Sequence, residues 1–221
     1  MGKKSLVVLI SGSGSNLQAI IDAVDKGEID ATISAVISNR PAVKGLERAA
    51  QANIKTIVID HTKFSGRDAF DAALAEQVNA LQPDLIVLAG FMRILNDNFI
   101  EQHKNKILNI HPSLLPKFKG LHTHRRAIEA EEMAHGASVH FVSNELDSGP
   151  VVIQAEVPVK DDDNEISLSE RVLQQEHIIY PMAIKWFIEG RLALMNNQVH
   201  MDNKPIKHPA IWKSDKLSIP V

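Results

Sequence analysis

Continuous aliphatic runs alternate with amphipathic segments along the first half of the chain. The runs at 6–10 and 85–89 predict buried strands of a parallel sheet, and further strands are predicted at 32–37 and 55–59. Between them, apolar residues recur every three to four positions, which predicts helices at 17–24, 43–52 and 65–81. This alternation predicts an α/β fold with a doubly wound, mostly parallel, Rossmann-like sheet.

The second half of the chain predicts an antiparallel hairpin between two helices. Strands are expected at 137–142 and 151–157, because the turn-rich segment 144–149 joins them. The helix before them is predicted at 122–132, and residues 135–136 are interpreted as its exit.

A long helix follows the hairpin. It is predicted to begin at a capping box of Ser167 and Glu170, to run to about residue 189 and to stop at Gly190. Within it, Glu176 and His177 have a surface position as the default interpretation.

The remaining polar stretches of the second half are predicted to be connections. The acidic segment 160–165 is interpreted as a solvated loop. Two short strands, 192–195 and 198–201, precede an end of the chain that we expect to be loose.

Composition excludes several classes of protein. The 221 residues are 44% hydrophobic with a net charge of −3, which allows a full core but gives no basic footprint for nucleic acid. There are no cysteines, so disulfides and thiolate metal sites are excluded. No apolar run approaches the ~20 residues of a membrane helix, and the basic start leads into a first strand. We therefore expect a cytoplasmic protein.

The sequence SGSGSN, residues 11–16, links the first strand to the first helix. Gly12 and Gly14 allow close approach of the backbone to a ligand, and the helix start favours negative charge. Leu17 replaces the third glycine of a dinucleotide fingerprint, and residues 38–40 lack the acidic group that holds a ribose. A single phosphate is the predicted ligand; a tight turn without a ligand is the alternative.

The segment 108–120, LNIHPSLLPKFKG, carries the main candidate chemistry. Asn109 and His111 are two positions apart, so an extended strand places both side chains on one side. Pro112 then ends the strand at the edge where ligands bind in open α/β sheets. The alternative is that both side chains only bond to nearby backbone.

Two other segments also allow more than one interpretation. Apolar residues continue past the fourth strand through 90–95, either as core or as the wall of a pocket for a flat ligand. Asp147 lies in the predicted hairpin turn, where an aspartate commonly caps its own backbone.

Taken together, these motifs resemble the folate-dependent formyltransferases, in particular those that act on glycinamide ribonucleotide in purine biosynthesis. The resemblance runs in order from VVLISGSGSNLQAII through VLAGFMRIL, LNIHPSLLPKFKGLHTHR and HGASVHFVSNELDSGPVVI to QQEHIIYP. It implies one formyltransferase domain over 1–221, with a phosphate-binding half at about 1–103 and a catalytic, folate-binding half at about 104–221.

The resemblance also implies roles for individual residues. The catalytic trio is Asn109, His111 and Asp147, and the residues for the ribonucleotide are Gly14, Ser15, Asn16 and Glu176. The residues for 10-formyltetrahydrofolate, as co-substrate, are Arg67, Met92, Arg93, Ile94, Leu95, Asn109, Ser143, Asn144, Glu145, Leu146 and Asp147. Leu173 departs from the family, which is expected to have a polar residue there.

Formyl transfer suits these residue types. Negative charge develops on the formyl oxygen when an amine attacks, and Asn109 and a protonated His111 can donate hydrogen bonds to it. Imidazole can also move a proton from the amine to the folate nitrogen, and a nearby Asp147 would stabilise the imidazolium. No metal is required: His122 and His124 do not have the spacing of a helical metal pair.

Three rival functions remain open at this point. A deformylase would pass the formyl group to water, a relative would act on methionyl-tRNA, and a nucleotide-binding module would not react at all. The expected partners are small molecules, with neither nucleic acid nor membrane, in a monomer or homodimer.

Overall fold

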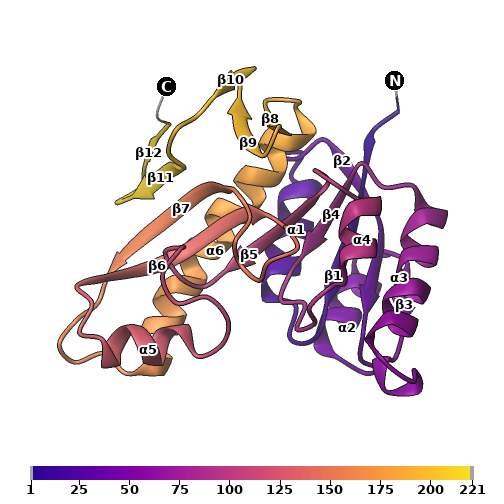
Figure 1. The fold of residues 1–221 in the computed structure, drawn as a ribbon, viewed down its shortest axis with the longest axis horizontal. Coiled ribbons are helices and arrows are strands. Elements are labelled where there is room, and N and C mark those ends of the chain that lie inside the picture. Colours follow the sequence, from indigo (N-terminus) through magenta and orange to yellow (C-terminus); the bar gives the residue numbers. More distant parts are fainter. Residues whose placement is uncertain (1, 220–221) are drawn as a thin grey trace. The chain divides into compact units, whose positions relative to one another are not determined.

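Five aliphatic segments form parallel strands in the spatial order β3-β2-β1-β4-β5 (Figure 1). Their bounds are Lys4–Ile10 (β1), Ala31–Ser38 (β2), Thr56–Val58 (β3), Leu85–Leu88 (β4) and Ile107–His111 (β5). This confirms the parallel sheet. The sequence-based boundary of β1 is short by two residues, because an apolar run marks the buried part of a strand and Lys4 and Ser5 are only half-buried.

The computed structural model describes residues 2–219. The chain divides into two compact units, one up to Asn109 and the other from Ile110 onwards, so β5 leads from the first unit into the second. No helix within 2–219 is long and apolar enough to cross a membrane.

The helices of the first unit form two contacting pairs, α1 with α2 and α3 with α4. Their bounds, with the short 3₁₀ helix η1, are Ser15–Asp25 (α1), Lys44–Gln51 (α2), His61–Lys63 (η1), Arg67–Leu81 (α3) and Asp97–Gln102 (α4). From β1 the chain goes to β2 on one side of the sheet, and β4 then pairs with β1 on the other side. The connections from β1 and β4 therefore diverge at the carboxyl ends of these strands, which is where such sheets bind ligands.

The second unit contains the predicted antiparallel hairpin, and α6 packs on both of its strands (Figure 1). Its first elements are Thr123–Glu129 (α5), Ala134–Phe141 (β6), Val151–Pro158 (β7) and Glu165–Ile188 (α6). The interpretation of His135 and Gly136 as a helix exit is wrong, because both belong to β6. A Cβ atom at Gly136 would lie 1.8 Å from the carbonyl oxygen of Ala155 in β7, so the glycine serves strand packing.

The start of α6 also differs from the prediction. The N-cap is Asn164, whose side chain accepts hydrogen bonds from the N–H groups of Ile166 and Ser167 at 2.9 and 3.0 Å. Ser167 completes this capping box from the third helical position, so the predicted box of Ser167 and Glu170 is wrong. The helix ends just before the predicted stop at Gly190.

The acidic connection before α6 is not wholly solvated. The Asp163 side chain is only 2% exposed, and it accepts two hydrogen bonds of 2.7 Å from the Arg171 guanidinium. The carboxylate ties the loop to the second turn of the helix.

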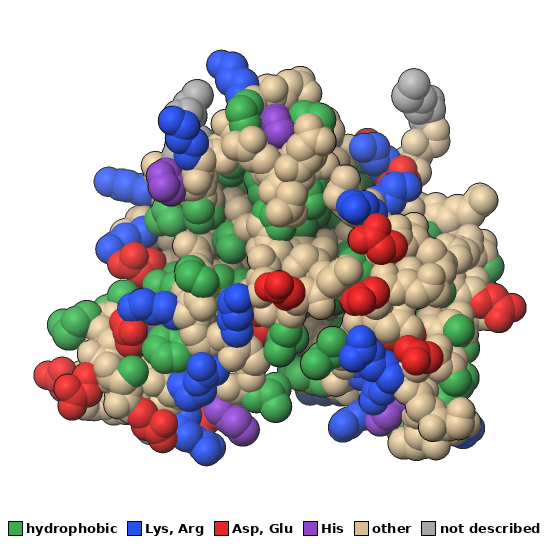
Figure 2. Space-filling view, viewed as in Figure 1, with side chains coloured by type: hydrophobic (Ala, Val, Ile, Leu, Met, Phe, Trp, Pro, Cys, Tyr) green, Lys and Arg blue, Asp and Glu red, His purple; other side chains and the backbone are tan. Residues whose placement is uncertain are grey.

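The end of the chain is ordered in strands over most of its described length. Its strands are Leu192–Met195 (β8), Gln198–Met201 (β9), Lys204–Pro205 (β10), Ala210–Lys213 (β11) and Lys216–Ser218 (β12). For the residues up to 219 the expectation of a loose end is wrong, because β11 pairs in parallel with β7 and the Trp212 indole donates to Gln175 of α6 at 3.0 Å. Residues 220–221 lie outside the described part of the chain. Acidic and basic side chains are interspersed on the face in Figure 2, as the small net charge suggests.

Candidate functional site

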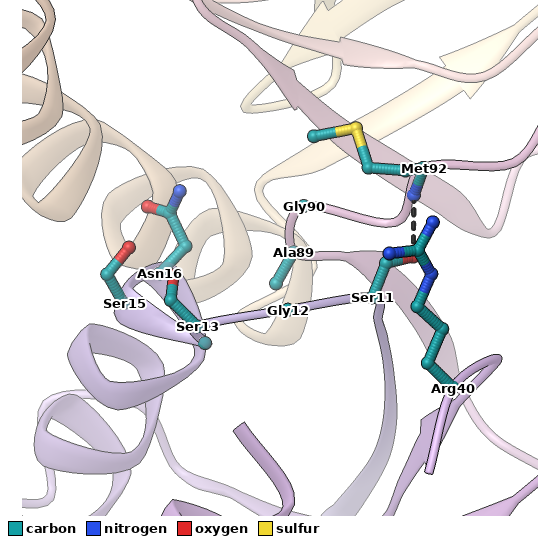
Figure 3. A pocket seen from close by; sticks show the side chains of 10 residues that line it. Ser11, Gly12, Ser13, Ser15, Asn16, Arg40, Ala89, Gly90 and Met92 are labelled. Carbon is teal, nitrogen blue, oxygen red and sulfur yellow. Dashed lines mark hydrogen bonds between the residues drawn. The ribbon is translucent and has the colours of Figure 1, made fainter. Parts of the chain in front are cut away.

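A cavity of about 180 Å³ lies in the first unit, where β1 and β4 end (Figure 3). The lining residues follow the ends of β1, β2 and β4: Ser11, Gly12, Ser13, Gly14, Ser15, Asn16, Arg40, Ala89, Gly90 and Met92. The cavity therefore occupies the position that the strand order predicts for a ligand. It contains all three loop residues expected to hold a phosphate, Gly14, Ser15 and Asn16.

The glycine loop reaches its conformation through one backbone contact. Gly14, the N-cap of α1, has a left-handed φ of +70°, and a Cβ atom there would lie 2.6 Å from Cα of Gly45. Gly45 lies in the first turn of α2, and its N–H donates to the carbonyl of Gly12 at 3.0 Å. Close packing of the two helix starts thus fixes the loop, and the first N–H groups of α1 suit an anion.

Two arginines that the sequence interpretation missed give this loop positive charge. Arg40 is the one charged residue among the described residues that line the cavity. Figure 3 shows it on the side of Ser11 and Met92, opposite Ser15 and Asn16. The sequence offered one indication of Arg40: it is a basic residue just after β2, close to the position at which a dinucleotide-binding site carries an acidic residue.

The second arginine supports the loop from α2. Arg48 donates from Nε to the carbonyl of Ser13 at 3.0 Å and from Nη1 to Gln18 at 3.1 Å. It therefore orders the loop.

A buried hydroxyl joins the glycine loop to the segment after β4. Ser11 donates from Oγ to the Asn39 carboxamide at 2.6 Å and accepts from the N–H of Met92 at 2.7 Å (Figure 3). Ser11 and Asn39 are both buried. The Ser11 side chain thus connects two walls of the cavity, the glycine loop and the segment after β4.

The apolar segment after β4 fits both of its interpretations. Phe91 and Leu95 are buried, whereas Met92 and Ile94 are 68% and 52% exposed. The exposed pair offers apolar surface for a flat ligand, and the buried pair belongs to the core. The Leu95 carbonyl accepts a hydrogen bond of 3.2 Å from the Arg67 guanidinium, so two predicted folate residues are in contact.

The second unit contains a buried histidine–aspartate pair. His111 is the last residue of β5, and its Nδ1 lies 3.4 Å from Oδ2 of Asp147, with side-chain exposures of 7% and 8%. The same oxygen accepts the N–H of Gly120 at 2.9 Å. Asp147 therefore faces residues far away in sequence, which is not the arrangement of an aspartate that only caps its own turn.

Other groups determine the orientation of this pair. Nε2 of His111 donates to the carbonyl of Phe118 at 2.9 Å. Oδ1 of Asp147 lies 3.8 Å from Nε2 of His140, and burial lowers the pKa of His140. Burial therefore disfavours the charged form of His140 beside Asp147.

The other predicted residues occupy varied environments. Asn109 is half-buried in β5, two positions before His111. Glu176 is buried in α6, so the default surface position is wrong for this residue. In the turn before Asp147, Ser143 is half-buried, and Asn144, Glu145 and Leu146 are exposed.

A second histidine pair lies in this unit. Nε2 of His135 is 3.2 Å from Nδ1 of His124, and burial lowers the pKa of His135 to about 4. Within residues 2–219, no three His, Asp or Glu side chains are grouped to bind a metal ion.

Comparison with known proteins agrees with this arrangement. Residues 4–184 match the family described as formyl transferase. The chain is 51% identical to phosphoribosylglycinamide formyltransferase of Escherichia coli (strain K12), over 90% of this chain and 94% of that protein. It is 45% identical to the trifunctional purine biosynthetic protein adenosine-3 of Homo sapiens, over 88% of this chain and 19% of that protein.

Solved structures give the same result. Phosphoribosylglycinamide formyltransferase from Coxiella burnetii matches with a TM-score of 0.89 and 49% identity, covering 92% of this chain and 96% of the other. Glycinamide ribonucleotide transformylase 1 from Symbiobacterium toebii matches with a TM-score of 0.87 and 45% identity, covering 90% and 94%. The cavity, the histidine–aspartate pair and these similarities lead to one conclusion: the chain belongs to the formyl transferase family.

Proposed function

We propose that the protein transfers the formyl group of 10-formyltetrahydrofolate to the amino group of glycinamide ribonucleotide, a step of purine biosynthesis. The observation that carries the proposal is the buried pair of His111 and Asp147 at the end of β5. A module that only bound nucleotides would not need an oriented imidazole, whereas formyl transfer requires donors and a proton carrier. The names of the relatives reported above support the ribonucleotide as the acceptor of the formyl group.

The phosphate of the ribonucleotide is assigned to the cavity of the first unit. The N–H groups at the start of α1, contributed by Ser15 and Asn16, would donate to its oxygens, and Arg40 would supply charge. Glu176 is assigned to the sugar, because a carboxylate accepts hydrogen bonds from hydroxyl groups.

The folate is assigned to Arg67 and to residues 92–95 and 143–147. The exposed side chains of Met92 and Ile94 give a flat pteridine an apolar surface. The Arg67 guanidinium can pair with a carboxylate of the folate glutamate.

His111 and Asn109 are proposed to act on the formyl group itself. The amine nitrogen attacks the formyl carbon, the new C–N bond forms, and charge collects on the formyl oxygen. The Asn109 amide donates a hydrogen bond to that oxygen. Nε2–H of His111 also donates to it, after giving up its hydrogen bond to the Phe118 carbonyl. The bond to folate N10 then breaks, and the proton lost by the amine passes to N10 through imidazole or water.

Asp147 keeps His111 in the orientation and charge state that this reaction requires. Its Oδ2 stays beside Nδ1, so a protonated imidazole is stabilised while Nε2 faces the substrate. No covalent intermediate with the protein is needed, because the substrate amine is the nucleophile.

The test is to follow release of tetrahydrofolate from 10-formyltetrahydrofolate, with and without glycinamide ribonucleotide. Folate product is expected only when the ribonucleotide is present, in an equal amount to formylated ribonucleotide. Comparable turnover without the ribonucleotide would identify a deformylase and contradict the proposal.

A further inference from the structure

Asp71 is a buried acid in α3 that none of the roles above uses. Its side chain is 0% exposed. Aspartate is rarely buried to this extent unless its charge is paired, because removal of a carboxylate from water is costly. Its contacts therefore indicate what the buried charge accomplishes.

The carboxylate joins α3 to the end of the segment 92–95. Oδ2 accepts the backbone N–H of Asn96 at 2.7 Å. Asn96 is the N-cap of α4, where its own side chain accepts the N–H of Phe99 at 2.9 Å. One oxygen of Asp71 thus fixes the backbone directly after Leu95.

The same oxygen lies near the predicted folate arginine. It is 3.8 Å from Nε of Arg67, whose Nη2 donates to the Leu95 carbonyl at 3.2 Å. The Arg67 side chain is still 47% exposed. The guanidinium is therefore held on its inner side by α3 and by the segment 92–95, and its outer side faces solvent.

Opposing electrostatic effects act on Asp71. Burial raises the pKa of Asp71, while the Asn96 N–H and the charges of Arg67 and Arg93 lower it. Within the described residues, Oδ1 of Asp71 and Nε of Arg93 are buried without a hydrogen-bond partner. The Arg93 guanidinium instead lies over the Phe70 ring, 5.0 Å from its centroid. The cost of burying the Asp71 carboxylate is thus offset in part by one backbone hydrogen bond and by two nearby arginines.

We propose that Asp71 is a positioning residue for the folate donor, acting through Arg67 and the backbone of 92–96. Its charge orients the guanidinium, and its bond to Asn96 holds the apolar surface of Met92 and Ile94 in the receptive conformation. This inference rests on the proposed function and extends it to a residue outside the expected site. If Asp71 had only a structural role, its substitution would lower stability without affecting the folate donor and the ribonucleotide differently.

The test compares Asp71→Asn with Glu76→Gln, which makes the same acid-to-amide change at an exposed position of α3. An asparagine side chain at the buried position can still accept the Asn96 N–H through its amide oxygen, while the charge beside Arg67 is lost. Initial rates are measured against each substrate, and tetrahydrofolate binding is measured by calorimetry.

Asp71→Asn is expected to raise KM for the folate donor and Kd for tetrahydrofolate about tenfold, as for one lost charge-assisted contact. KM for the ribonucleotide and kcat should stay close to wild type, as should every value for Glu76→Gln. Combined with Arg67→Met, the effect of Asp71→Asn should largely disappear, because residues acting through one another are not additive.

The two proposals fail in different ways. A wild-type protein without ribonucleotide-dependent turnover contradicts the proposed function. Normal wild-type turnover with unchanged folate KM and tetrahydrofolate Kd in folded Asp71→Asn overturns the role of Asp71 alone. If Asp71→Asn does not fold, Asp71→Ser, which also removes the charge beside Arg67, takes its place in the same measurements. A higher folate KM and tetrahydrofolate Kd in folded Asp71→Ser support the proposal, and unchanged values overturn it.

Discussion

Nδ1 of His111 lies 3.4 Å from Oδ2 of Asp147, although β5 and the β6–β7 turn supply the two residues separately. The carboxylate is held there by the N–H of Gly120, and the imidazole by the carbonyl of Phe118. Both ring nitrogens of His111 thus have defined neighbours. This relationship makes the role of Asp147 directly testable.

Asp147→Asn should reduce turnover by about 10²–10⁴-fold, the range for a disabled proton-transfer group, because the amide cannot stabilise imidazolium. The variant should fold, since an amide oxygen still accepts the Gly120 N–H. Steady-state rates and far-UV circular dichroism check both expectations. Asp215→Asn is the matched control, because Asp215 is an exposed turn aspartate with a similar positive φ. Near-normal turnover in folded Asp147→Asn would show that Asp147 is not required.

Asn16 should serve the ribonucleotide rather than the folate, because it lies at the start of α1 in the wall of the cavity. Asn16→Ala is expected to weaken ribonucleotide binding about tenfold, the loss of a hydrogen bond to a charged group, and to leave folate binding nearly unchanged. Calorimetric titration with each ligand measures this. Loss of folate binding instead would mean that the two ligand assignments are reversed.

Arg40→Gln tests whether the cavity binds an anion. Because Arg40 is the charged residue in the described lining, its loss should raise KM for the ribonucleotide several-fold with little change in kcat. The wild-type KM should also rise with salt more steeply than that of the variant, because salt screens an exposed charge. Equal salt dependence in both proteins would remove Arg40 from phosphate binding.

Gly14→Ala should destabilise the protein more than Gly27→Ala. Both glycines have a left-handed φ, +70° and +73°, so alanine is strained by about 1 kcal/mol or more at either position. Only at Gly14 would the new Cβ meet backbone, at 2.6 Å from Gly45 Cα, whereas nothing lies within 4 Å at Gly27. Free energies of unfolding from urea titration compare the two. Equal losses would contradict the packing contact between α1 and α2.

Asp163→Asn should lower stability in a pH-dependent way. Hydrogen bonding to Arg171 holds the pKa of Asp163 well below its ordinary value of 3.8. The folded carboxylate therefore stays charged where the unfolded one binds a proton, so its stabilisation is complete above about pH 4 and is lost as the pH falls further. At pH 7 the variant should lose about 1–3 kcal/mol of unfolding free energy.

The difference from wild type should shrink as the pH falls from about 4 towards about 2, where the unfolded carboxylate is protonated. Asp161→Asn, at an exposed position in the same acidic loop, is the control and should match wild type at every pH. If the loss of unfolding free energy in Asp163→Asn did not change with pH, the loss would be due to packing and not to the ion pair.

Hydrophobic periodicity and local motifs were sufficient for most of the fold. Aliphatic runs indicated β1 and β4, because a strand buried on both faces needs apolar side chains along its buried length. The predicted boundaries of β6 and α6 are wrong because the same local residues are compatible with two different structures. Glycine is common at the end of a helix, but Gly136 lies in β6, where only a hydrogen atom fits against the carbonyl oxygen of Ala155. The sequence predicts Ser167 as the cap of α6 instead of Asn164, because both residue types commonly cap helices.

Local sequence was enough to place polar groups at strand ends: Asn109 and His111 in β5, and the glycine loop after β1. These positions depend on local chain geometry, in which alternation along a strand and the start of a helix fix direction. The partner that each group receives depends instead on the folded chain. Asp147 meets His111, Arg40 enters the cavity lining and Asp71 accepts the N–H of Asn96. Strand order and packing bring these residues together, and their separation along the sequence does not reveal how close they lie in space.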